Sequence, residues 1–452
     1  MKKLNLLFIS MLSMSFMYGQ DITDALRYSQ DDIQGPPRFR ALSGAFGALG
    51  GDMSAVSLNP AGSAVFAKSH ASFSLSNVDT KNDTQYFNGF TSASDSKFDF
   101  NQGGTVFVFV NYDSNSPWKK FALSIAYDKM ANYDNVWVAN GTNTNNNSID
   151  LYFLGYADGL RLDEISALPG ESISDAYSEI GRYYGFGHQQ AFLGYESYIL
   201  EPDANDDANT TYFSNLANGT FDQEYIYATR GYNGKITFNA AVQYEDNLFL
   251  GLNLNSHLLH YDRSTQLFED NSNLGSIINN IDFENTLSTI GTGFSFQLGG
   301  ILKLTNEFRL GLTYDSPTWY NIEEETTQYL STVRDNGGSN ATQVINPQIV
   351  NVYPTYKLQT PAKITGSLAY IFGTQGLLSF DYSRKDYSTT KFKPTSDAFF
   401  ADQNNVISNV LTDASTYRFG GEYKVKQFSF RGGYRFEESP YKNGFTVGDL
   451  TG

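Results

Sequence analysis

The feature that most constrains this chain is a period-two alternation of large apolar residues with small or polar ones, which recurs from Ser69 onward. In residues 121–127, Phe, Leu, Ile and Tyr alternate with Ala, Ser and Ala. Comparable stretches are 236–244, 248–254, 294–298, 308–314, 364–372, 378–382, 417–425 and 428–436. Successive side chains of a β-strand point to opposite faces, so each stretch predicts a strand with one apolar and one polar face.

A soluble β-sandwich alternates in the same way, so strand length must separate the two architectures. Soluble strands usually run about five or six residues. Here the stretches 247–269 and 307–329 extend much further. Asp246-Asn247 and Thr305-Asn306 are predicted to be tight turns, each of which joins two long strands. Tyr and Phe gather near strand ends, which is typical of the aromatic girdles of membrane barrels. We therefore predict an all-β fold, a transmembrane antiparallel β-barrel over residues 69–452.

Charge and composition exclude several other classes of protein. The net charge of −17 excludes attraction to a phosphate backbone as a basis for binding, so we expect no nucleic-acid partner. The absence of Cys excludes disulfide frameworks, thiolate metal sites and cysteine nucleophiles. Mean hydropathy is −0.36, and beyond the N-terminus no apolar run reaches the roughly 18 residues that a membrane helix needs.

The first residues have the order of a secretory signal peptide. Lys2 and Lys3 precede an apolar stretch, residues 4–17, and polar sequence begins after Gly19. A basic start, an apolar centre and a small residue before the cleavage point define such a signal. We predict a signal peptide over 1–19 with cleavage near Gly19, and hence export. Together with the predicted barrel, export places the protein in the cell outer membrane.

Three regions interrupt the strand pattern: the segment before the first strand, within 20–68, a long segment over 139–223, and a shorter insertion over 396–413. The long segment contains an apolar stripe with residues three or four apart, which predicts a short amphipathic helix. The stripe consists of Ile173, Ala176, Tyr177, Ile180 and Tyr184. Long connections in a barrel are commonly functional, so we expect 139–223 to be an extracellular loop.

The segment from Arg38 to Phe66 is rich in Gly and Ala, which let backbone pack closely against a wall. Asp52 is placed to cap a short helix through Leu58, which Asn59-Pro60 then ends. This composition predicts a segment folded inside a confined space, and no residue in it suggests catalysis.

The sequence GGDMSAVSLNPAG, at residues 50–62, stands shortly before the first alternating strand. In this arrangement the chain resembles the FadL-type transporters of long-chain fatty acids and other hydrophobic compounds. The resemblance rests mainly on Asn59, Pro60, Ala61 and Gly62, which together with Asp52 would form the motif of the hatch. It implies a monomeric barrel of about fourteen strands, with an N-terminal hatch over 20–68 inside its lumen. It further implies passive uptake of apolar ligands without a cofactor, and their lateral release at a kinked third strand.

The last residues, 448–452, are loop-like, whereas outer-membrane barrels commonly finish on a strand. We therefore expect the sequence to lack about three final strands of the implied barrel.

Three groups of residues are candidates for transport. Alternation fails at Lys129, Met130, Ala131 and Asn132, where a bulge would make a lateral gate; a simple irregularity in register explains the same pattern. Candidate ligand contacts are Phe39, Leu42 and Phe46 of the hatch, and Ile173, Tyr177, Ile180, Tyr184 and Phe192 of the long loop. The loop residues would equally form the loop's own core.

The polar faces of the predicted strands place several charges inside the barrel: Arg309, Asp381, Arg418, Glu422, Lys424, Arg431 and Arg435. Arg431 or Arg435 would suit a ligand carboxylate. The alternative, which we favour, is that these charges pair with one another and with hatch residues such as Asp52.

Other functions receive less support from the sequence. A general porin would need an open lumen, and an outer-membrane lipase or protease would need a Ser-His or Asp-His set that nothing here requires. A haem receptor or adhesin would use His188, which we expect in a loop. His257 and His260 should face opposite sides of a strand, so we expect no metal site. The acidic clusters 203–207 and 323–325 are interpreted as solvated loops.

Overall fold

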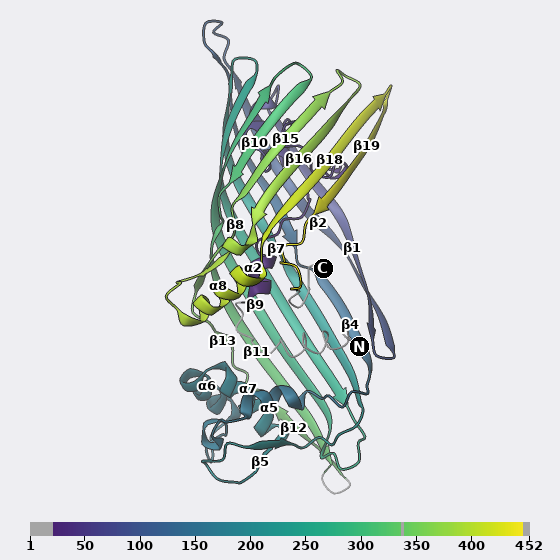
Figure 1. The fold of residues 1–452 in the computed structure, drawn as a ribbon, viewed down its shortest axis with the longest axis vertical. Helices are drawn as coiled ribbons and strands as arrows, with labels where there is room; N and C mark the ends of the chain where they lie inside the picture. The colour runs from purple at the N-terminus through teal and green to yellow at the C-terminus, as the bar shows by residue number, and fades with distance from the viewer. Residues whose placement is uncertain (1–20, 336–338, 446–452) are drawn as a thin grey trace.

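The computed structural model describes residues 21–335 and 339–445, so the predicted signal peptide lies outside the described residues. Its main element is a 17-stranded sheet whose strand pairs are antiparallel (Figure 1). The strands of this sheet are β1 (His70–Tyr86), β2 (Gly89–Val110), β3 (Trp118–Asn132), β4 (Asn135–Asn143), β7 (Phe221–Tyr244), β8 (Leu248–Asp270), β9 (Ile278–Lys303), β10 (Phe308–Asp315), β11 (Trp319–Asp335), β12 (Asn340–Ile345), β13 (Asn351–Val352), β14 (Tyr356–Gln359), β15 (Lys363–Ile371), β16 (Gly376–Asp386), β17 (Lys391–Lys393), β18 (Asp413–Val425) and β19 (Phe428–Glu437). The predicted all-β class is confirmed, and every alternating stretch lies in a strand or runs one residue past its end.

Some neighbouring strands are halves of one longer path through the sheet. β10 and β11 both pair with β9, and Pro317 lies between them. The uninterrupted strand expected over 307–329 was therefore wrong at this point, because proline removes a ladder hydrogen bond. β3 and β4 likewise both pair with β7. Among the described residues, β1 forms a ladder only with β2, and β19 forms one only with β18, so β1 and β19 are not paired with each other.

The two faces of the sheet differ in the expected way. On β7, Phe238 is 55% exposed while its neighbour Asn239 is 4% exposed. Asn239 and two polar residues on the next strands, Asn253 and Gln297, lie on one face and bond to backbone oxygens of residues 56–60. We call this the inner face and the opposite, apolar one the outer face.

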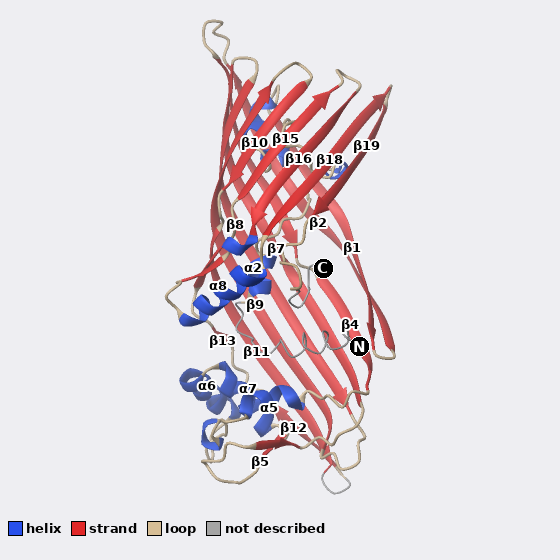
Figure 2. Cartoon of the chain, in the orientation of Figure 1, coloured by secondary structure: helices blue, strands red, loops and turns tan. Residues whose placement is uncertain are grey.

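The two ends of the strands differ as well (Figure 2). Short turns at 245–247, 304–307 and 372–375 occupy the upper end, and long connections occupy the lower part. The longest connection, residues 144–220, is called the excursion. It holds α5 (Asp150–Ala157), α6 (Ile173–Tyr184), α7 (Phe186–Glu196) and the small sheet of β5 (Leu200–Pro202) and β6 (Tyr212–Ser214). The shorter insertion forms α8 (Ala398–Val410).

The predicted long loop began too early and ended too late, since β4 runs to Asn143 and β7 starts at Phe221. The helix expected from the apolar stripe is α6. Glu323, Glu324 and Glu325 were wrongly expected in a solvated loop, because they lie within β11 and Glu324 is 1% exposed. No helix within the described residues is both long and apolar enough to cross a membrane.

Candidate functional site

The N-terminal segment, Asp21–Phe66, is built from four short helices, three of which are capped at the N-terminus by the side chain of the preceding residue. They are α2 (Ile22–Arg27), α3 (Pro37–Ala41), α4 (Met53–Val56) and the 3₁₀ helix η2 (Pro60–Val65). The Asp52 side chain accepts a hydrogen bond from Ser54 N at 3.0 Å, so the predicted cap is confirmed. Burial raises the pKa of the Asp52 carboxyl, and among the described residues it forms no ion pair within 4.0 Å. The expected pairing of interior charges with Asp52 is therefore wrong.

Asn59 joins this segment to the sheet. Its Oδ1 accepts from Ala61 N at 3.1 Å, while its Nδ2 donates to Gly47 O at 2.7 Å and to Gly300 O at 3.1 Å. The side chain is fully buried, so each of these polar groups depends on the others for a partner. One residue thus starts η2, ties two parts of the segment together and holds both against β9.

The inner face carries glycine where the N-terminal segment comes closest. A Cβ on Gly251 would lie 2.3 Å from Pro60 C, one on Gly299 would lie 2.1 Å from Asn59 Oδ1, and one on Gly311 would lie 2.5 Å from Gly47 O. Real Cβ atoms essentially never approach other atoms so closely. The inner face of the sheet and the N-terminal segment are therefore in close contact, with backbone packed against backbone.

The interior charges are largely paired. Glu422 receives Arg38 of the segment at 2.7 Å, Arg431 at 2.9 Å and Lys424 at 3.3 Å. Arg435 donates to Asp31 O at 3.2 Å and forms an ion pair with Glu437. Arg431 and Arg435 are therefore both paired with carboxylates of the protein, which agrees with the charge pairing that we favoured over binding of a ligand carboxylate.

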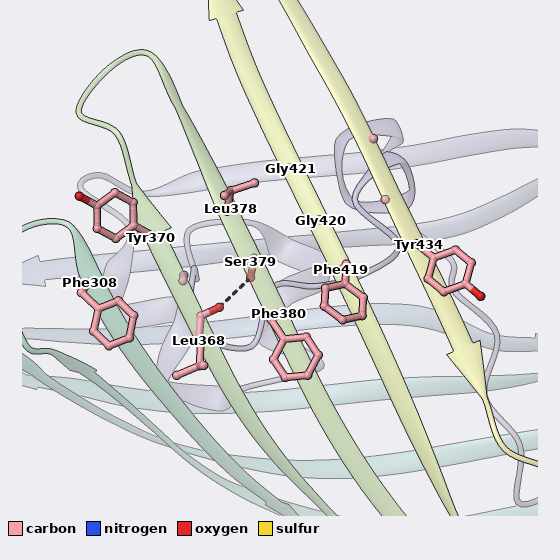
Figure 3. A pocket seen from close by; sticks show the side chains of 13 residues that line it. Phe308, Leu368, Tyr370, Leu378, Ser379, Phe380, Phe419, Gly420, Gly421 and Tyr434 are labelled. Atoms are coloured by element: carbon pink, nitrogen blue, oxygen red, sulfur yellow. Dashed lines mark hydrogen bonds between the residues drawn. The ribbon is translucent and has the colours of Figure 1, made fainter.

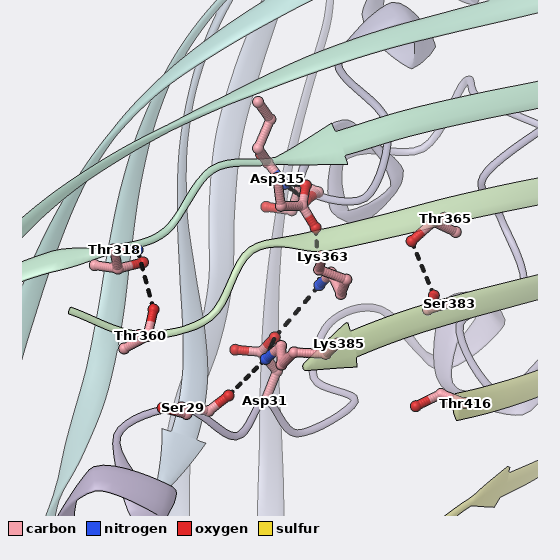
Figure 4. Close-up of polar contacts among 12 residues, drawn as sticks. Ser29, Asp31, Asp315, Thr318, Thr360, Lys363, Thr365, Ser383, Lys385 and Thr416 are labelled. Atoms are coloured by element: carbon pink, nitrogen blue, oxygen red, sulfur yellow. Dashed lines mark hydrogen bonds and ion pairs between the residues drawn. The ribbon is translucent and has the colours of Figure 1, made fainter. Parts of the chain in front are cut away.

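A second group of charges lies on β10, β15, β16 and the N-terminal segment (Figure 4). Lys363 Nζ is 3.0 Å from Asp315 Oδ2 and 3.4 Å from Asp31 Oδ2, and Lys385 Nζ is 3.6 Å from that same Asp31 oxygen. Buried Lys235 lines the same polar cavity, whose volume is about 60 Å³. Sequence reasoning missed this cluster. Its one sequence signal is a lysine at an inner-face position in each of two consecutive strands.

The predicted irregularity in the third strand is a real bulge. Lys129 pairs with Gly234 and Ala131 pairs with Asn233, which leaves Met130 between them without a partner on β7. The β2–β3 ladder ends at the pair Gln102 and Asp128, and among the described residues no ladder joins β2 to β4.

The N-terminal segment reaches this bulge. Asp32 N donates to Met130 O at 2.6 Å, and Asn132 N donates to Asp32 Oδ2 at 3.3 Å. A cavity of about 430 Å³ lies beside the contact, between α2 and the start of β4. Its lining includes Arg27, Gln30, Asp32, Ala131, Asn132 and Tyr133. Three of the four predicted gate residues thus lie at one junction with the segment, whereas Lys129 pairs with Asp99 instead.

The sequence of this chain matches one family of known proteins. Residues 210–447 match the family described as "Outer membrane protein transport protein (OMPP1/FadL/TodX)". This match spans more than half of the chain. The chain belongs to this family. The family consists of outer-membrane transport proteins, which agrees with the resemblance seen in residues 50–62.

The search of solved structures finds matches of low sequence identity. A Pseudomonas aeruginosa FadL homologue has 12% identity and a TM-score of 0.49, with 92% of this chain and 82% of that chain covered. The Pseudomonas putida toluene transporter TodX has 13% identity and a TM-score of 0.46, with 91% and 85% covered. The Ralstonia pickettii toluene transporter TbuX has 15% identity and a TM-score of 0.41, with 90% and 87% covered. No curated protein matches the sequence.

In this family member the candidate ligand residues occupy two separate cores. Phe39, Leu42 and Phe46 are buried together with Ala369 and Leu377 of the sheet. Ala176, Tyr177, Ile180 and Phe192 form the core of the excursion with apolar residues of β9, β11 and β12, and Ile173 packs against it. Tyr184 is 49% exposed. The buried candidate residues are almost entirely shielded from solvent. This favours a role in the protein core over direct contact with a ligand.

An apolar groove of about 460 Å³ lies on the outer face, across β15, β16, β18 and β19 (Figure 3). Gly421 and Gly432, which have no side chain, lie in the groove. The side chains of Leu368, Phe380, Phe419 and Tyr434 surround it. It belongs to the same exposed apolar surface as the other outward-facing strand residues.

The histidines are engaged in local contacts. His188 lies in the first turn of α7, so its expected place in a loop was wrong; it stacks on Tyr184 at 4.8 Å and is 3.6 Å from Glu164. His257 faces inward and contacts Ser295 at 2.8 Å, whereas His260 is on the outer face near Asp262. Within 21–335 and 339–445, no group of three or more His, Cys, Asp or Glu side chains is arranged to hold a metal ion.

Proposed function

We propose that this protein takes up hydrophobic small molecules passively across the outer membrane, with long-chain fatty acids as one ligand class. The observation that carries the proposal is the junction at the β3 bulge. At this junction the N-terminal segment contacts the sheet where no ladder joins β2 to β4. A cavity of about 430 Å³ lies beside the contact. A ligand that reached this cavity would leave sideways, without crossing the polar interior.

The proposal includes a membrane-spanning barrel of about fourteen strands with residues 20–68 as its hatch. The apolar outer face suits lipid, because a charge at the bilayer midplane costs about 2–4 kcal/mol in such barrels. The contacts of the N-terminal segment with inner-face residues of β7, β8 and β9 support its role as a plug. In this proposal the protein works as a monomer after loss of its signal peptide near Gly19.

The excursion is the proposed collecting surface. Exposed apolar side chains on it, including Leu168, Tyr183 and Tyr184, would catch ligands outside the cell. From there ligands would pass to the cavity at Ala131 and Asn132 and on to the bilayer.

The test is removal of the bulge. Met130 has no partner on β7, so deleting it should restore regular pairing of β3 with β7. A matched control exists in the same strand, because Lys119, between Trp118 and Lys120, is a second residue without a partner on β7. Labelled oleate uptake into cells that lack their own transporter should be lost on deletion of Met130 and kept on deletion of Lys119.

Polar solutes separate this proposal from a general porin. Neither deletion should raise the permeation of a small sugar through wild-type-like folded protein, since the N-terminal segment still covers the inner face. Equal oleate uptake by both deletion variants would refute lateral release, and rapid sugar flux through the wild type would support the porin.

A further inference from the structure

The hairpin of β1 and β2 has an outer face that changes from apolar to polar along its length. At the start of β1 this face is apolar, and Phe73, Leu75 and their neighbour Phe98 of β2 are 74%, 46% and 74% exposed. Toward the turn at Phe87-Asn88 the face becomes polar. Its exposed polar side chains there are Asn77, Asp79, Lys81, Asp83, Gln85, Ser92, Ser94 and Ser96.

The polar part of the hairpin stands beyond the bilayer of the proposed function. A lysine at the bilayer midplane costs about 2–4 kcal/mol, so Lys81, which is 65% exposed, does not suit lipid. The turn lies on the side of the excursion, because Asn88 Oδ1 accepts from Thr142 N at 2.8 Å, close to the end of β4 (Figure 1). The polar part therefore continues the lipid-facing surface of the same two strands toward the outside of the cell.

The hairpin is held in place by its opposite face, which is turned toward β4. Tyr86 OH donates to Gln223 Oε1 at 2.6 Å, and Asn82 Nδ2 donates to Val136 O at 2.7 Å. These contacts leave the outer face free. Among the described residues, its polar side chains form hydrogen bonds and ion pairs only with one another.

The polar part forms a shallow trough between two aromatic rings. Along β2, three small hydroxyl side chains, at residues 92, 94 and 96, lie between Phe90, which is 68% exposed, and Phe98. The register places a longer polar side chain of β1 opposite each serine, namely Asp83, Lys81 and Asp79. We call residues 77–85 and 90–98 on this face the trough.

The length of the trough excludes an ordinary phospholipid head group as the group that covers it. From Asn77 to Gln85 the strand extends about 26 Å at about 3.3 Å per residue. It still rises about 18 Å if it is tilted by about 45° from the membrane normal. The head-group layer on one side of a bilayer is only about 5–8 Å thick. Phospholipid head groups would therefore cover only the first residues of the trough.

We propose that the trough binds the sugar chain of glycolipids in the outer leaflet of the same membrane. Sugar hydroxyls both donate and accept hydrogen bonds, as the serine, amide and carboxylate groups require. The C–H face of a pyranose ring packs on an exposed aromatic ring such as Phe90. With two carboxylates and one lysine, the trough favours uncharged sugars. The inference rests on the proposed function, because the acyl chains of the same glycolipid would contact Phe73 and Leu75.

The first experiment is a calorimetric titration of the full-length protein in phospholipid nanodiscs with the sugar chain released from lipopolysaccharide by mild acid. Phe90→Ala should weaken binding about tenfold, because a ring that packs on the sugar is lost. Ser94→Glu should weaken it about tenfold or more, because the longer side chain fills the trough. Phe213→Ala, at a 47% exposed ring of β6, is the matched control and should bind as the wild type does. Labelled oleate uptake should be unchanged in all three variants.

The second experiment uses the absence of native Cys. Gln85→Cys places a thiol on the trough, and Thr84→Cys places one on the opposite face of the same strand. Maleimide should label Gln85→Cys about tenfold more slowly in vesicles with full-length lipopolysaccharide than in vesicles with lipid A alone. Labelling of Thr84→Cys should not change.

The inference is overturned if both thiols respond equally to the sugar chain, which would indicate crowding or no contact, or if both trough variants bind the released chain as tightly as the wild type does. Failure of the wild type to take up oleate would instead overturn the proposed function. Sugar binding would still be measurable in nanodiscs, so the two failures are distinguishable.

Discussion

At the scale of single residues, the contact between the inner face of the sheet and the N-terminal segment depends on glycines, which have no side chain. Gly311→Ala would place a Cβ 2.5 Å from Gly47 O, and overpacking of this kind costs about 1–3 kcal/mol. We expect faster hydrogen exchange of the amides of residues 44–52, measured by mass spectrometry. Gly366→Ala is the matched control on the adjacent strand, because its Cβ would meet nothing within 4 Å. Equal exchange in both variants would contradict a tight fit.

Asn59 gives a second prediction at this scale. Asn59→Ala leaves three buried backbone groups without their partner, and each such group costs about 1–3 kcal/mol. Asn59→Asp should be worse, because a carboxylate would face the carbonyls of Gly47 and Gly300 without a proton to donate. Trypsin should cleave at Arg38 and Arg40 faster in both variants. The exposed substitution Asn405→Ala should leave cleavage unchanged, and an unchanged rate in the Asn59→Asp variant would show that the wall does not depend on this side chain.

At the scale of elements, α7 offers a pH-dependent test in the excursion. Glu196 accepts from Ala167 N at 3.0 Å, and burial raises the pKa of its carboxyl. A carboxyl whose folded pKa is raised destabilises the fold when ionised, and this penalty is relieved as the pH falls through the folded pKa. Glu196→Gln keeps the acceptor oxygen without the charge. It should therefore increase hydrogen-exchange protection of α7 at pH 8 and reduce the gain between pH 8 and pH 5.

Glu171→Gln is the control for that prediction, since Glu171 also accepts a backbone N–H, from Leu168 at 2.9 Å, in a more exposed position. The same change in protection for both variants would mean that burial of Glu196 is not the cause.

The elements also show what the sequence can predict. Alternation is a direct record of strand geometry, so the strands, the tight turns and the bulge near Met130 were all accessible from it. The interruption at Pro317 was accessible as well, because proline removes a ladder hydrogen bond. The burial of Glu324 was not, because it depends on a contact distant in the sequence, the hydrogen bond that Tyr356 of β14 donates to it at 2.7 Å. The facing of Lys363 and Lys385 depends on the register between β15 and β16, which one sequence does not determine.

At the scale of the whole molecule, the usual distribution of polarity is reversed. Asn239, Asn253 and Gln297 are buried on the inner face, while large apolar side chains are exposed on the outer face, such as Phe238 of β7, Leu254 of β8 and Phe294 of β9. A soluble protein rarely exposes so extensive an apolar surface. Figure 1 shows that these strands run side by side along most of the length of the molecule. Their register places the exposed side chains of Leu252, Leu298, Tyr314 and Ile364 next to one another on four neighbouring strands, so these residues form a band.

Strand β8 allows the position of this band to be tested. On its outer face Leu250, Leu252, Leu254 and Leu258 precede His260 and Asp262, so apolar surface gives way to polar surface between 258 and 260. Leu254→Arg should lower the free energy of unfolding in lipid vesicles by about 2–4 kcal/mol, the cost of Arg near a bilayer midplane, and His260→Arg by about 0–1 kcal/mol. Denaturant titration of vesicle-inserted protein measures both. Equal losses for the two variants would mean that the outer face of β8 does not lie across a bilayer, because only a depth-dependent solvent distinguishes two outward positions six residues apart.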